Sequence, residues 1–195
     1  MSNLTAQEPV APSANLSIAD DELYEIIDGQ RVLPPPKSVR AVWIASQILQ
    51  HIGHFGRAHN VGHSICHALF RLPLPIDRQR RPAVAFVSYD RWTKGRRLHE
   101  SDNAWDVLPN LAVEVISATD LAEEVQVKVG EYFQAGVTLV WVVYPRTHQV
   151  HLYESLSSIR VLSRTDELDG GNVLPSFRLM LTELFLESAP DGPAA

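Results

Sequence analysis

Apolar and polar residues alternate over Tyr24–Leu33 on both sides of an Asp-Gly pair. This pattern predicts a β-hairpin, because Asp-Gly favours the tight turn that joins two antiparallel strands. Three prolines then end the second strand, and Ser38 is a suitable N-cap for a helix over Val39–His54, where apolar residues recur at helical spacing. Gly53 and Gly56 are expected to end this helix.

Apolar runs farther along the chain predict several more strands and two more helices. The strand over Val61–Leu72 is weakly indicated, whereas the other strands are predicted over Ala83–Ser88, Asn110–Ser117, Thr138–Tyr144, Gln149–Glu154 and Ile159–Ser163. The helices are predicted over Asp120–Gln134, closed by Gly136, and near Leu181–Leu186. This order predicts an α/β (α+β) protein with a mixed central sheet flanked by helices and an N-terminal β-hairpin.

The length of 195 residues and the hydrophobic content of 45% favour one domain, which we place at residues 21–186. The flanking stretches 1–20 and 187–195 are rich in Pro, Ala and Ser and are expected to be disordered tails. The longest apolar run, Val137–Tyr144, is too short to span a bilayer, so a soluble protein without a membrane partner is expected. The single cysteine, Cys66, excludes an internal disulfide, fits a reducing cytoplasm and is expected to be buried.

A carboxylate, Glu114, stands in the middle of an otherwise apolar predicted strand. If buried, it needs a partner, a proton or a metal ion. The inward stripe of the next helix is expected to contain Leu121, Val125, Val129, Tyr132 and Phe133. Lys128 lies at the edge of that stripe, so its ammonium could reach Glu114. An equal alternative is that Glu114 lies in water at a strand end while Lys128 extends along the helix surface.

Positive charge is concentrated in one segment, although the whole chain has a net charge of −6. Between Arg71 and Arg97 the sequence contains eight arginines and lysines but only two aspartates. Such a segment could bind phosphates, and a solvated loop is the equal alternative.

Six segments in order along the chain resemble the Uma family of putative restriction endonucleases, a branch of the PD-(D/E)XK nuclease superfamily. They are YEIIDGQRVLPPP, PAVAFV, PNLAVEVIS, KVGEYFQAGV, LVWVVYP and LDGGNVLPSFRLMLTELF. The resemblance extends from Leu23 to Phe185 and implies a restriction-endonuclease-like fold. It also implies that an aspartate and a Glu-x-Lys motif bind Mg²⁺ or Mn²⁺ and position a water that attacks a nucleic-acid phosphodiester bond.

Glu114 matches the glutamate of that motif, and Ile116 stands where its lysine would be. In the Uma branch the lysine typically comes from the following helix, as Lys128 would here. The strand PAVAFV departs from the family, because Ala83 occupies the position of the first metal-binding aspartate. Asp77 or Asp90 could replace that aspartate only if the chain folded back, since each is about 20 Å away along an extended strand.

Two functions therefore remain open. One is a metal-dependent endonuclease with Glu114 and Lys128 as catalytic residues, Glu114 as a metal ligand, and Arg78, Arg80 and Arg81 on the phosphates. The other is a catalytically inactive nuclease-like module that binds nucleic acid or protein. DNA is the expected partner, and a homodimer is an open alternative. A zinc site among the histidines lacks a third ligand at a fixed spacing, so hydrogen-bonded or surface histidines are favoured.

Overall fold

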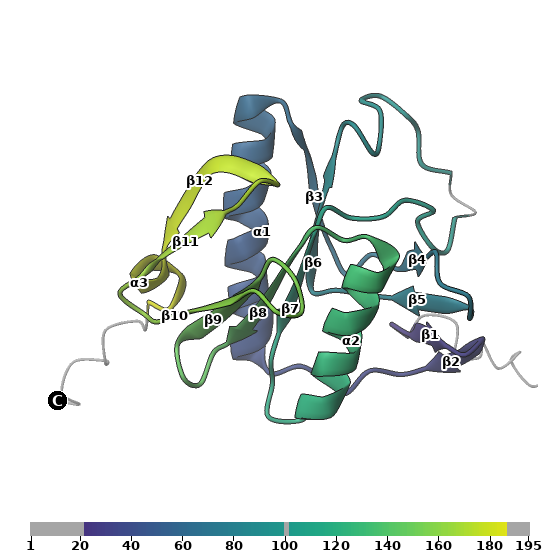
Figure 1. The fold of residues 1–195 in the computed structure, drawn as a ribbon, viewed down its shortest axis with the longest axis horizontal. Helices are drawn as coiled ribbons and strands as arrows, with labels where there is room; N and C mark the ends of the chain where they lie inside the picture. The colour runs from purple at the N-terminus through teal and green to yellow at the C-terminus, as the bar shows by residue number, and fades with distance from the viewer. Residues whose placement is uncertain (1–21, 100–101, 187–195) are drawn as a thin grey trace, which may run out of the picture.

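A mixed six-stranded sheet forms the centre of this computed structural model, which describes residues 22–99 and 102–186 (Figure 1). Its strand order is β10-β9-β8-β7-β6-β3. The bounds are β3 Gly62–Cys66, β6 Val84–Ser88, β7 Leu111–Val115, β8 Leu139–Tyr144, β9 Gln149–Tyr153 and β10 Ile159–Leu162. Among the strand pairs of this sheet, β7 with β8 is parallel and the others are antiparallel, and the helix between β7 and β8 supplies the crossover. The predicted α/β class and mixed sheet are confirmed, and the predicted tails lie outside the described residues.

Helix α1 (Val39–His59) packs on one face of this sheet, and α2 (Ala122–Ala135) packs on the other (Figure 1). Ser38 caps α1 as predicted, because its hydroxyl accepts from the backbone N–H of Ala41 at 3.2 Å. Strand alternation along β7 sends Leu111, Val113 and Val115 to the α1 side. It sends Ala112 and Glu114 to the side of α2.

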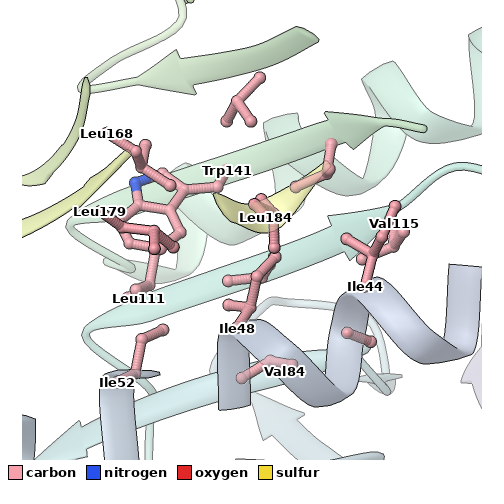
Figure 2. Close-up of a cluster of buried hydrophobic side chains, with 14 of the residues drawn as sticks. Ile44, Ile48, Ile52, Val84, Leu111, Val115, Trp141, Leu168, Leu179 and Leu184 are labelled. Carbon is pink, nitrogen blue, oxygen red and sulfur yellow. The ribbon is translucent and has the colours of Figure 1, made fainter. Parts of the chain in front are cut away.

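A C-terminal hairpin completes the α1 face. It consists of β11 (Glu167–Gly170) and β12 (Leu174–Met180), and the short helix α3 (Leu181–Leu184) follows it. Figure 2 shows isoleucines of α1 near Val84 and Leu111, with Leu168 and Leu179 next to Trp141 and Leu184 toward Ile48. Because all these side chains are buried, this face is the main hydrophobic core.

A second sheet lies beside α2, in the order β2-β1-β5-β4 (Figure 1). Its strands are β1 Glu25–Ile27, β2 Gln30–Val32, β4 Phe70–Leu72 and β5 Arg78–Arg80. Strands β1 and β2 form the predicted hairpin. Strand β5 pairs with both β1 and β4, so it brings the centre of the basic segment next to the N-terminal hairpin.

The prediction that Gly53 and Gly56 end the first helix is wrong, because α1 continues to His59. Both glycines instead allow α1 to approach β3 closely. A Cβ atom on Gly53 would lie 2.7 Å from the Ser64 hydroxyl oxygen, and one on Gly56 would lie 2.9 Å from the Gly62 carbonyl oxygen. The helix ends at Asn60, which adopts a positive φ of 55°.

Three other expectations need correction. The single weak strand over Val61–Leu72 is two strands, β3 and β4, separated by a turn in which His67 has a positive φ. Leu121 is not part of the inward stripe, because it precedes the first turn of α2 and is exposed. Cys66 is exposed at the edge strand β3. In the described part of the chain, no helix has both the length and the apolar character needed to cross a membrane.

Candidate active site

Glu114 and Lys128 line one pocket of about 430 Å³, as the strand and helix phases predict. The pocket lies between the first half of α2, the β1–β2 hairpin and the end of β7. Glu25, Arg78, Arg80, Lys37 and Asp120 also contribute to its lining. The arrangement places charged groups from four separate parts of the sequence around one opening.

Glu114 is buried, with 5% of its surface exposed, and its Oε1 accepts a hydrogen bond of 2.8 Å from the Tyr132 hydroxyl. Burial raises the pKa of Glu114 despite the opposing positive charge of Lys128. Burial also raises the pKa of Tyr132, and the neighbouring Glu114 carboxyl reinforces that shift. The phenol therefore stays a proton donor to Glu114 over the ordinary pH range.

The ammonium of Lys128 pairs with Glu25, with 2.9 Å between Nζ and Oε1. Glu25 lies on β1, is 4% exposed, and accepts two further hydrogen bonds, from Arg80 Nη1 at 2.8 Å and from the backbone N–H of Arg81 at 3.0 Å. Burial alone would raise the pKa of Glu25, but the cations of Lys128 and Arg80 outweigh it and lower the pKa. Burial disfavours the charged form of Lys128, and the carboxylates of Glu114 and Glu25 overcome this and raise its pKa.

Arg78 and Arg80 are both engaged by the carboxylate of Glu131 on α2. Arg80 Nε lies 2.5 Å from one Glu131 oxygen, and Arg78 Nε lies 3.2 Å from the other. Arg78 also pairs with Asp28 in the hairpin turn at 2.8 Å. Arg81 donates from Nε to the Tyr24 carbonyl and from Nη1 to the His67 carbonyl. Binding of phosphate by Arg78, Arg80 and Arg81 stays a prediction, and in this structure each guanidinium already holds the hairpin or its surroundings in place.

Ala83 is buried and directly precedes β6, at the end of that strand nearest Glu114. The antiparallel register of β6 and β7 ends with Val84 opposite Val113, the neighbour of Glu114. The Ala83 methyl group belongs to the buried cluster under α1, whereas Glu114 lines the pocket on the other face. The structure brings neither Asp77 nor Asp90 to this place. Asp77 precedes β5 and lines a different pocket, and Asp90 is exposed in the turn at the other end of β6.

The carboxylates of this pocket do not fit a bound Mg²⁺ as they stand. Mg²⁺ requires oxygen ligands in near-octahedral geometry, and Ala83 offers only a methyl group. The Glu25 carboxylate already accepts from three donors, and the cations of Lys128 and Arg80 beside it would repel a divalent ion. Within residues 22–99 and 102–186, no group of three or more His, Cys, Asp or Glu side chains is arranged to hold a metal ion.

Glu25 was missed by the sequence analysis, although the signal that identified Glu114 is present there too. It is a carboxylate at an alternating position of a short apolar strand. The hairpin pattern drew attention to the turn, and a strand of three residues gave too little periodicity to show that Glu25 points inward. Tyr132 was predicted as an inward residue, but its hydrogen bond to Glu114 was not.

A family model described as "Uma2: Putative restriction endonuclease" matches residues 13–182 of this sequence. The chain belongs to the Uma2 family. Its fold is similar to that of a crystal structure from Anabaena variabilis, described as a putative nuclease belonging to DUF820, with a TM-score of 0.72. The two chains share 14% sequence identity, and the match covers 83% of this chain and 89% of that one. At this identity the similarity shows the fold alone. No curated protein matches this Uma2 chain.

Proposed function

We propose that this Uma2 chain binds nucleic acid with a nuclease fold but cleaves phosphodiester bonds very weakly or not at all. The observation that carries the proposal is Ala83, which directly precedes β6 at the position where the family resemblance implies a metal-binding aspartate, and which does not line the pocket of Glu114. Family membership supports nucleic acid as the partner. One remaining carboxylate at that place holds a hydrated Mg²⁺ poorly.

The charge balance inside the pocket supports the same proposal. Tyr132 donates to Glu114, and Lys128 and Arg80 neutralise Glu25. These internal contacts compensate the buried carboxylates with protein groups, so the folded chain does not depend on a metal ion for that purpose.

An active nuclease is the second candidate, and one observation favours it. Glu25, Glu114 and Lys128 share one open pocket, whose lining contains six carboxylates and four cationic side chains. An excess of acidic groups attracts cations. In this candidate Glu25 would take the place of the missing aspartate after releasing Lys128.

The decisive variant is Ala83→Asp, with Ala83→Asn as a control of nearly equal size and no charge. Ala83 is buried, so the added carboxylate should lower stability without metal. Mg²⁺ or Mn²⁺ should then restore stability in Ala83→Asp alone. At an ion concentration ten times the Kd the gain is about 1.4 kcal/mol, or roughly 3–6 °C in Tm for a chain of this size. Thermal melts with and without the ion measure this difference.

Cleavage of plasmid and linear DNA with Mg²⁺ or Mn²⁺ separates the two candidates. Wild type should leave DNA intact, and Ala83→Asp is the variant expected to gain cleavage. If wild type cleaves and Glu114→Gln abolishes that cleavage, the degenerate-site proposal is wrong. Glu25→Gln then tests whether Glu25 is the substitute carboxylate.

A further inference from the structure

The turn that follows β6 contains several cations that form no ion pair with any residue in the described part of the chain. Residues 91–99 contain Arg91, Lys94, Arg96 and Arg97 and no carboxylate, with Asp90 directly before them and Glu100 directly after them. Figure 1 shows this segment at the top of the view, at the far end of the sheet from the loop between β7 and α2. It is therefore separate from the pocket around Glu114.

The base of this segment is firmly anchored. Arg91 donates to the backbone carbonyls of Leu108, Pro109 and Gly136, at 2.7 to 3.3 Å. Trp92 is 7% exposed and packs edge-on against Trp105, with 5.0 Å between ring centroids. Because Arg91 and Trp92 fix the start of the segment, the cations that follow project from a defined support.

Lys94, Arg96 and Arg97 are exposed, and the side chains that Lys94 and Arg96 contact are neutral. Lys94 donates to the side-chain oxygen of Asn60 at 2.5 Å, and the Arg96 guanidinium lies 4.2 Å from the centre of the Trp92 ring. Among residues 22–99 and 102–186, no carboxylate forms an ion pair with these three side chains. Their positive charge thus remains available to an external anion.

The end of α1 extends this cationic surface. Lys94 contacts Asn60, the C-cap of α1, and the last turn of that helix carries the basic residues Arg57 and His59. The opposing charges nearby are Asp90, Asp102 and Asp106, of which Asp102 accepts a hydrogen bond from the backbone N–H of His99. Arg57 and the loop cations thus lie at the same end of the protein.

We propose that Lys94, Arg96 and Arg97 form a surface that binds the phosphate backbone of a nucleic acid without reading its sequence. This proposal rests on the proposed function, namely that the chain binds nucleic acid. It assigns the phosphate contacts to this loop in place of Arg78, Arg80 and Arg81. Strand β6 connects Ala83 to this loop, because Ala83 precedes the strand and Ser88 ends it. Its five residues span about 17 Å, which is roughly five base-pair steps of duplex DNA.

The test compares Arg96→Ala/Arg97→Ala with the charge-matched control Arg146→Ala/Arg164→Ala, whose arginines are exposed elsewhere on the protein. Fluorescence anisotropy measures the affinity for several labelled DNA duplexes. Each duplex has about 20 base pairs, their sequences are unrelated, and the salt concentration is varied between about 50 and 200 mM. The loop variant should bind on the order of ten-fold more weakly at the lower salt, equally for all sequences. Its plot of log K against log salt should be shallower by about two.

Three results would contradict the proposal that Lys94, Arg96 and Arg97 bind phosphates. They are an unchanged affinity and salt slope in the loop variant, an equal loss in the control variant, and no binding of any duplex by wild type. None of these outcomes depends on metal ions. The metal-dependent gain expected of Ala83→Asp therefore tests the degenerate pocket independently of the binding surface.

Discussion

Replacing Arg80 with methionine should destabilise the protein more than any substitution in an exposed ion pair. The Arg80 side chain is 5% exposed and links Glu25 of β1 to Glu131 of α2, at 2.8 and 2.5 Å. Methionine keeps much of the side-chain volume but removes both bonds. Two buried carboxylates then lose a cation that compensated their desolvation.

Two charge-assisted hydrogen bonds are worth about 3–6 kcal/mol together, at about 1.5–3 kcal/mol each. Removal of one member of a buried ion pair costs about 3–5 kcal/mol. Glu25 keeps Lys128, and Glu131 keeps Arg78, so we expect the lower end of this range. A loss of about 3 kcal/mol corresponds to roughly 6–12 °C in Tm for a protein of this size.

Urea unfolding followed by circular dichroism, at neutral pH and again near pH 4, measures the effect. The pKa of Glu25 is lowered in the folded protein, so its contribution is present above about pH 4.5 and is lost as the pH falls through the lowered pKa. The difference between Arg80→Met and wild type should therefore shrink in acid. Arg178→Met is the control, because its pair with Glu167 is about half exposed and should contribute under about 1 kcal/mol. A loss for Arg80→Met no larger than that of the control would refute the reasoning.

Two further predictions concern the pocket and the helices. The pKa of Glu114 is raised, so its contribution to stability is full below about pH 4.5 and is lost as the pH rises through the raised pKa. Glu114→Gln should therefore have a higher Tm than wild type at pH 7, and its Tm should lack the decrease that the ionisation of Glu114 causes. Gly130→Ala should add roughly 0.5–1 kcal/mol, because a Cβ there meets nothing within 4 Å. Gly56→Ala should destabilise, because its Cβ would lie 2.9 Å from a backbone oxygen; urea unfolding that shows no difference between the two alanine variants would contradict this contrast.

The sequence alone determined the order of the main elements and half of the pocket. Alternation along β7 placed Glu114 on the face opposite Leu111, Val113 and Val115, and the helical phase placed Lys128 over the same side. These inferences succeed because strand and helix periodicities are local properties of the chain. The family resemblance rested on the same segments, and the match over residues 13–182 confirms it.

Only the tertiary structure decided how the buried charges are paired. Arg80 and Glu25 are 55 residues apart in sequence and meet because β5 pairs with β1. Lys128 and Glu25 are 103 residues apart and meet because α2 lies beside that second sheet. The same pairing turned Arg78 and Arg80 inward, so the arginines that appeared suited to phosphate became internal partners of carboxylates. A short strand has too few residues to reveal its inward face, and the partners of a buried charge depend on which distant strands lie side by side.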